Sequence, residues 1–304
     1  MGIWQHRWLH LVGIVGVAVG GFVIHPSLRP AIAQTSQQVS QAPNAALSEA
    51  AVERGLTLIQ QGAIEPATAA FREAIELDPN SAAAYYNLGL VQRQTGQLQE
   101  AATSFWQALE ADPNFAMAYS NLGAALWEGG NLEQAQEYLE RAIQIQPDLG
   151  NAYYNLGLVQ LDQENYGAAI ASLQRAENAT PNAPEPSFHQ GRIYLRQQNY
   201  SAAIGAFNRA ISIFPEYVEA YYNLGVAQYG QGDYSASLDA FRKATEYNPG
   251  YANAYYSAGL SFIRLGDYAE ARGVLEHAKS LYITQNNPQW ATNTQAQLDR
   301  IAGQ

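Results

Sequence analysis

The sequence predicts an all-α protein built from seven copies of one helical hairpin, because three residue types recur in steps of 34. Glycine stands at 55, 89, 123, 157, 191, 225 and 259. Proline stands at 79, 113, 147, 181, 215 and 249, and alanine at 74, 108, 142, 176, 210, 244 and 278. A period of this length is typical of solenoids, in which each unit buries its apolar face against its neighbours.

Composition excludes several classes of function. The 304 residues are 47% apolar and only 14% charged, and they include 20 tyrosines. A net charge of −11 leaves little basic surface for nucleic-acid phosphates. The absence of cysteine excludes disulfides, thiolate zinc sites and a cysteine nucleophile.

Residues 1–33 are expected to be an export signal. They contain no acidic residue, and the apolar run 11–24 is shorter than the roughly 20 residues that a membrane-spanning helix needs. Small side chains at Ala31 and Ala33 favour cleavage before Gln34. The protein is then expected in a bacterial periplasm, secreted, or in a thylakoid lumen. The alternative is an uncleaved membrane anchor at 11–24, which would be the protein's only contact with a membrane.

The segment 34–47 is rich in Gln, Ser and Ala and is expected to be a flexible linker. With Ser48 at position 1, the repeats are expected at 48–81, 82–115, 116–149, 150–183, 184–217, 218–251 and 252–285. Residues 286–304 should form a C-terminal cap helix and tail.

Each repeat is predicted to contain two helices. In the second repeat, Tyr85, Leu88 and Gly89 fall at helical spacing, and a second apolar stripe contains Phe105. Gly96 predicts the left-handed residue of the turn between the helices, and each second helix should end before its proline. The fifth repeat begins with two prolines, so its first helix is expected to start late or to bend the stack.

The residues that carry this pattern in the second repeat are Tyr85, Leu88, Gly89, Ala101, Phe105, Ala108 and Pro113. They resemble the tetratricopeptide repeat family, and the resemblance covers residues 48–285. It implies a right-handed α-solenoid whose first helices line a concave groove and whose second helices form the convex back.

On that groove, two columns are candidates for binding an extended peptide. Position 6 of the repeats holds Asn87, Asn121, Asn155 and Asn223, with His189 in the fifth repeat; position 5 holds Tyr86, Tyr154, Tyr222 and Tyr256. An Asn amide can donate to and accept from one peptide unit, and Tyr offers contact area at low entropy cost. The resemblance extends to superhelical family members in which such a ladder holds peptide backbone. Arg192 and Arg196 could attract an acidic segment or a terminal carboxylate.

These observations favour a non-enzymatic protein-interaction scaffold that binds an extended peptide of unknown origin. The alternative is an assembly factor of the envelope or thylakoid, in which Asn and Tyr are structural and the convex face or self-association acts. His189 has no nucleophile or metal partner at a defined spacing, and His277 lacks a second histidine four residues on. No catalytic residue, metal site or cofactor is therefore expected, and no nucleic acid.

Overall fold

The computed structural model describes residues 35–304, with side chains from Asn44 onward. The expected signal at 1–33 lies outside the described residues. Residues 43–304 form one compact unit. Within the described part there are fifteen α-helices and no strands, which confirms the predicted all-α solenoid. None of these helices combines the length and apolar character that a membrane span requires.

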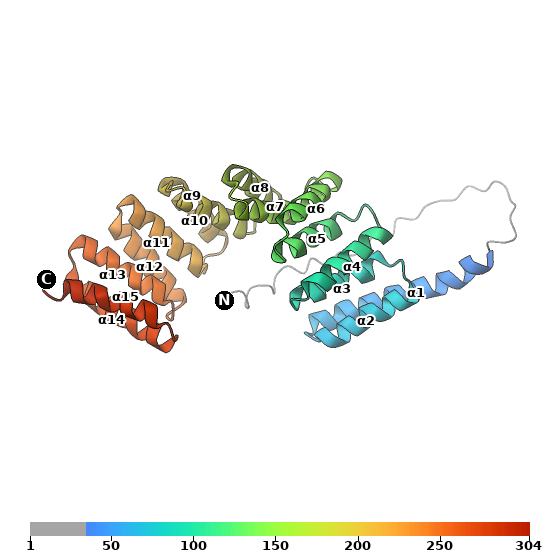
Figure 1. The fold of residues 1–304 in the computed structure, drawn as a ribbon, viewed down its shortest axis with the longest axis horizontal. Coiled ribbons are helices and arrows are strands. Elements are labelled where there is room, and N and C mark those ends of the chain that lie inside the picture. The colour runs from blue at the N-terminus through green and yellow to red at the C-terminus, as the bar shows by residue number, and fades with distance from the viewer. Residues whose placement is uncertain (1–34) are drawn as a thin grey trace. The chain divides into compact units, whose positions relative to one another are not determined.

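The helices follow one another as antiparallel pairs, each pair beside the next (Figure 1). The first helices are α1 (Thr35–Gln60), α3 (Ala82–Gln94), α5 (Ala116–Glu128), α7 (Gly150–Asp162), α9 (Glu185–Arg196), α11 (Val218–Gln231) and α13 (Ala252–Leu265). The second helices are α2 (Ile64–Leu77), α4 (Leu98–Ala111), α6 (Leu132–Ile145), α8 (Tyr166–Ala179), α10 (Tyr200–Ile213), α12 (Tyr234–Tyr247) and α14 (Tyr268–Thr284). The last helix, α15 (Pro288–Ile301), packs on α14 as a cap.

The segment 34–47, expected to be a flexible linker, is helical from Thr35, because α1 starts there. Gln and Ala are good helix formers, and a helix elongates easily from a turn that is already formed. Among residues 44–48, only Ser48 is buried, and its hydroxyl donates to the Ala74 carbonyl at 2.8 Å, while residues 44–47 are exposed.

The helix boundaries follow the predicted turn chemistry. Glycines in the left-handed region join the two helices of five repeats, for example Gly96 at φ 78°. In the fourth and fifth repeats Glu164 and Gln198 adopt this conformation instead, at φ 59° and 57°. The fifth repeat shows the expected late start, because α9 begins at Glu185, after Pro184.

The recurrent glycine of each first helix lies directly under a large side chain of the paired second helix. A Cβ built on Gly225 would lie 2.6 Å from Cε1 of Phe241, and one on Gly157 would lie 2.8 Å from Cγ of Leu173. The Phe241 ring is itself 1% exposed. These side chains therefore contact bare backbone within their own hairpin, in addition to filling space between repeats.

Two glycine substitutions should change stability in opposite directions. Gly225→Ala should destabilise the protein by about 1–3 kcal/mol, because the methyl group overpacks the Phe241 ring. Gly273→Ala, in the middle of α14 with open space around it, should stabilise by about 0.5–1 kcal/mol through helix propensity alone. Urea unfolding followed by circular dichroism measures both. A similar loss in both variants would contradict the packing role of Gly225.

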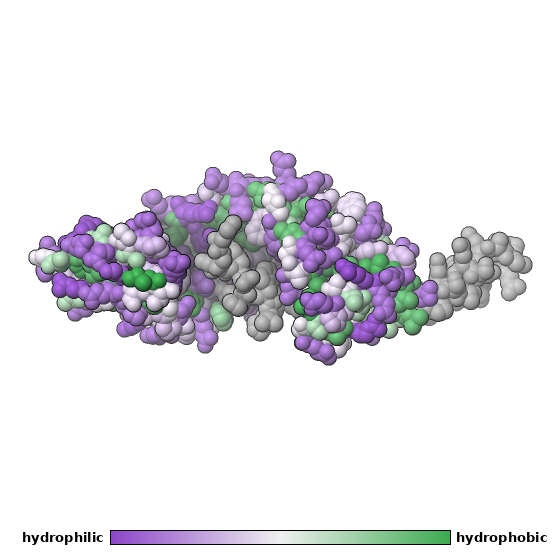
Figure 2. All heavy atoms as spheres, turned by 60° about the horizontal axis from the view of Figure 1, so that its bottom comes forward, coloured by the Kyte–Doolittle hydropathy of each residue, from purple (hydrophilic) through white to green (hydrophobic). Residues whose placement is uncertain are grey.

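First helices of successive repeats contact one another directly at α3–α5, α5–α7, α9–α11 and α11–α13. No pair of second helices within residues 43–304 approaches as extensively. The first helices therefore lie on the inner side of the stack, as the resemblance implies. Hydrophilic residues cover most of the described surface seen in Figure 2, and hydrophobic residues form separate patches.

The junction between the fourth and fifth repeats is polar. Glu177 of α8 accepts hydrogen bonds from the Ser187 hydroxyl at 2.8 Å, the Gln190 amide at 2.9 Å and Arg209 Nε at 2.9 Å. Arg209 also donates to Gln190 Oε1 at 3.0 Å. The direct approach of first helices is weaker here, between α7 and α9, than at the four contacts above. Although burial acts to raise the pKa of Glu177, these hydrogen bonds and the Arg209 charge outweigh it and lower that pKa.

This junction should make the free energy of unfolding depend on pH in the acid range. Because the pKa of Glu177 is lower in the folded state, its stabilising contribution is present above the unfolded value of 4.5 and is lost as pH falls below it. Glu177→Gln should therefore lower the urea midpoint at pH 7, and the difference from the original chain should shrink at pH near 3.

A matched control is Glu246→Gln in the exposed pair with Lys243, where solvent screens the interaction and the change should be smaller. An equal effect in both variants, or a Glu177 effect that persists unchanged at acid pH, would contradict the role of the junction.

Candidate functional site

The predicted site residues all lie on first helices and share one surface, which we call the ladder face. It consists of the side chains at repeat positions 5, 6, 9, 12 and 13 of α3, α5, α7, α9, α11 and α13. These spacings place them along one side of a helix. The ladder face is the inner side of the stack, so it is the surface on which neighbouring repeats come closest.

Three of the four predicted asparagines keep hydrogen-bonding capacity. Asn87 Nδ2 donates to the Ala83 carbonyl at 2.8 Å, and Asn223 Nδ2 donates to the Glu219 carbonyl at 2.7 Å. These bonds fix the amides to their own helix and use one of their two N–H groups. Asn155, half-buried on α7, makes no side-chain hydrogen bond to the described residues. Each of the three can therefore still donate to and accept from a ligand.

Asn121 differs from the other three, although the sequence makes it equivalent. Its Nδ2 donates to the Tyr86 hydroxyl at 3.1 Å and to the Met117 carbonyl at 3.0 Å. Its Oδ1 accepts from Arg93 Nη1 at 3.2 Å. The amide thus joins the second and third repeats, and its donors are already occupied.

The position 5 tyrosines mainly connect repeats. Tyr86 accepts the hydrogen bond from Asn121 of the next repeat, its ring lies 4.8 Å from that of Phe115 in its own repeat, and burial raises its pKa to about 12. Burial raises the pKa of Tyr222, and Ser257 of the next repeat partly offsets this rise. The Tyr154 ring lies 5.7 Å from the His189 ring, also of the next repeat. The Tyr256 ring lies 5.3 Å from Trp290 of the cap helix. This arrangement supports the interpretation in which these tyrosines are structural.

His189 replaces asparagine in the fifth repeat and is 8% exposed. Burial, with a smaller contribution from Arg192, lowers its pKa to about 3, so the imidazole is neutral near neutral pH. Its ring lies edge-on to Phe188, with centroids 5.4 Å apart. Arg192 Nη1 lies 3.5 Å from its Nδ1.

Sequence reasoning missed a row of links between position 12 of one repeat and position 13 of the next. Arg93 pairs with Glu128 at 2.7 Å, and Trp127 Nε1 donates to Asp162 Oδ2 at 2.7 Å. Both links span 35 residues, so a signal exists in the sequence as complementary residues at that spacing. The fifth repeat places Arg196 opposite Leu161, and no such link forms between these two described residues.

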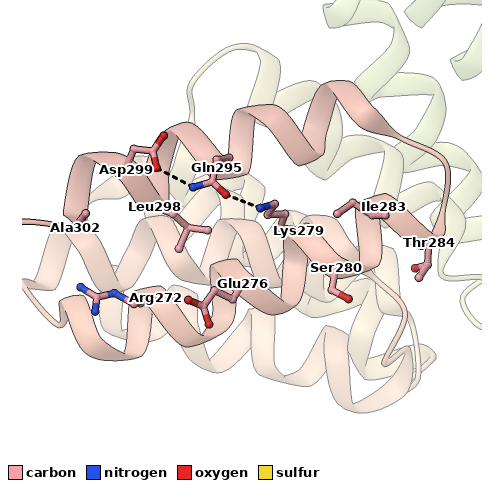
Figure 3. Close-up of a pocket in the computed structure, with 10 residues that line it drawn as sticks. All are labelled: Arg272, Glu276, Lys279, Ser280, Ile283, Thr284, Gln295, Leu298, Asp299 and Ala302. Atoms are coloured by element: carbon pink, nitrogen blue, oxygen red, sulfur yellow. Dashed lines mark hydrogen bonds between the residues drawn. The ribbon is translucent and has the colours of Figure 1, made fainter.

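Other parts of the described chain offer little for chemistry. No group of three or more histidine or acidic side chains among them could hold a metal ion. An open cavity of about 700 Å³ lies between α14 and α15 (Figure 3). Lys279, Gln295 and Asp299 form a hydrogen-bonded chain along it, and it contains none of the predicted site residues.

The free energy of unfolding should distinguish the linking Asn121 from Asn155, which makes no side-chain hydrogen bond to the described residues. Asn121→Ala should lower the free energy of unfolding by about 1 kcal/mol, because it breaks the links to Tyr86 and Arg93. Asn155→Ala should leave it within about 0.5 kcal/mol of the original. Thermal and urea unfolding measure both, and equal values would contradict the distinction.

Comparisons with known proteins agree with the stack of helical repeats described above. Models described as tetratricopeptide repeat match residues 188–244 and 227–288, 114–182, and 82–115, and one described as TPR repeat matches 55–96. No curated protein matches the chain.

Solved structures show the same fold. A tetratricopeptide repeat protein from Parabacteroides merdae is 21% identical with a TM-score of 0.58, covering 82% of this chain and 98% of its own. Pseudomonas aeruginosa pilF is 21% identical with a TM-score of 0.62, covering 70% and 96%. YrrB, described as a TPR protein with an unusual peptide-binding site, is 26% identical with a TM-score of 0.50, covering 60% and 95%.

Proposed function

Because this chain belongs to the tetratricopeptide repeat family, we propose that it is a protein-interaction scaffold that binds an extended peptide along its ladder face, without catalysis. The observation that supports this most directly is the set of half-buried amides at Asn87, Asn155 and Asn223, each with unused hydrogen-bonding capacity. They recur at one position of stacked repeats, so together they offer donors and acceptors along a line.

Such a line suits main-chain recognition. An extended peptide presents N–H and C=O groups at regular intervals, and an amide can bond both groups of one peptide unit without reading a side chain. The bonds from Asn87 and Asn223 to their own helix hold these side chains in place before a ligand arrives, which lowers the entropy cost of binding. The similarity to YrrB, whose description names a peptide-binding site, adds to this proposal.

Asn121 and the position 5 tyrosines play a different part in this proposal. They link neighbouring repeats and so set the spacing between the amides that bind. We further propose that the protein acts outside the cytoplasm, which rests on residues 1–33 alone.

A second candidate, self-association through the outer face, is favoured by aromatic side chains exposed on second helices. Trp106 is 45% exposed and Tyr247 is 41% exposed. A monomer at high concentration in sedimentation velocity would argue against this candidate and leave peptide binding unaffected.

The peptide-binding proposal is tested with a peptide selected from a phage-displayed random library and then made synthetically. The triple variant Asn87→Ala, Asn155→Ala, Asn223→Ala should bind it about a hundredfold more weakly, since each lost hydrogen bond is worth about 1 kcal/mol. Isothermal titration calorimetry measures the affinity, and circular dichroism confirms folding.

The matched control replaces three exposed asparagines outside the ladder positions, Asn151, Asn178 and Asn208, with alanine. It should bind like the original chain. Equal affinity for the ladder variant and the control would refute binding through the amides.

A further inference from the structure

We propose that Arg192 and Arg196 make the fifth repeat an anion-recognising position of the ladder face, which takes an acidic side chain from within the bound peptide. This inference rests on the proposed function and specifies its ligand. It assigns a preference to a groove whose asparagines alone would bind any sequence.

The two arginines share one surface and lack a carboxylate partner. They lie four residues apart on α9, so both reach the same side of the helix. The Arg192 guanidinium lies 6.0 Å from the centroid of the Phe188 ring and beside His189. Among the described residues, neither arginine has a carboxylate oxygen within 4.0 Å.

The groups that surround Arg192 do not balance its charge. His189 is neutral, and the side chains of Tyr154 and Tyr217 near Arg192 are not carboxylates. Asp162 is the nearby acid, and its Oδ2 already accepts the Trp127 indole hydrogen bond. Burial, and then the charge of Arg196, lower the pKa of Arg192, so the site is short of negative charge.

Other arginines of the ladder face are satisfied. Arg93 pairs with Glu128 and also donates to Asn121. The Arg264 guanidinium lies 4.9 Å from the Tyr234 ring centroid and donates to that hydroxyl. Arg192 and Arg196 are therefore the arginines of the ladder face that lack such partners among the described residues. They lie in the fifth repeat, where the row of links between positions 12 and 13 is interrupted.

The position of the pair along the ladder indicates an internal acidic residue. Asn155 precedes the fifth repeat by one unit and Asn223 follows it by one unit, while the buried His189 offers no amide between them. A peptide held at both asparagines runs past Arg192 and Arg196 with backbone on either side. A carboxylate accepts paired hydrogen bonds from guanidinium groups, so Asp or Glu at that point fits best.

The test uses the full chain and the same displayed random library. Peptides selected on the original chain should carry Asp or Glu at one fixed position, and those selected on the double variant Arg192→Gln, Arg196→Gln should not. A synthetic peptide, acetylated and amidated to remove terminal charges, should bind the original chain about tenfold better with Glu than with Gln at that position. The double variant should show less than about a twofold preference.

The control variant carries Arg141→Gln and Arg175→Gln, two exposed arginines of second helices, and should keep the preference. Acid-free peptides from the original chain, or an equal Glu preference in the double variant, would overturn this inference while leaving peptide binding intact. If the original chain binds a peptide with phosphoserine at that position more tightly than one with Glu, the recognised group is a phosphate and the carboxylate assignment is overturned. Selection of no peptide at all would overturn both proposals.

Discussion

The contact between a bare glycine in each first helix and a large apolar side chain of its partner helix determines the rest of the architecture. At Gly225 and Phe241 this contact is close enough that even a methyl group would collide. It fixes how the two helices of a hairpin pack, and such a hairpin cannot bury its remaining apolar surface alone. Stacking follows, and stacking brings position 5 of one repeat against position 6 of the next. The ladder face is therefore a consequence of packing inside the hairpins.

The fifth repeat departs from the residue pattern of the other repeats on two sides of its first helix, α9. Toward α8, Ser187 and Gln190 stand where most other repeats place Tyr and Leu, and Glu177 stands where Ile or Leu is usual. A partly buried carboxylate is costly without partners, and these two residues together with Arg209 supply them. On the ladder face of the same helix, His189 is buried and Arg192 has no carboxylate partner among the described residues. The junction between the fourth and fifth repeats is thus polar, and the fifth repeat also carries the unbalanced positive charge.

Most of the fold could be predicted from the sequence, because helix ends, turns and core positions each have a local chemical signature. The proline before α9 and the glycine at φ 78° after α3 act through neighbours in the chain, and the alanine column marks the buried core positions. The helical start of α1 at Thr35 could not be predicted in this way. Its Gln- and Ala-rich sequence suits both a linker and a helical extension, and the helix that follows it in the chain decides between them.

The site was less predictable, because a repeat period makes residues equivalent in sequence that are not equivalent in their contacts. Asn121 is held by Tyr86 and Arg93 of the preceding repeat, while Asn155 at the same position has no side-chain partner among the described residues. The repeat that precedes Asn155 has Ser120 and Trp127 at the positions of Tyr86 and Arg93, and neither bonds the Asn155 amide. The residues one repeat earlier therefore decide which asparagine amides keep unused hydrogen-bonding groups, and the proposed binding specificity comes from the departures from the repeat pattern.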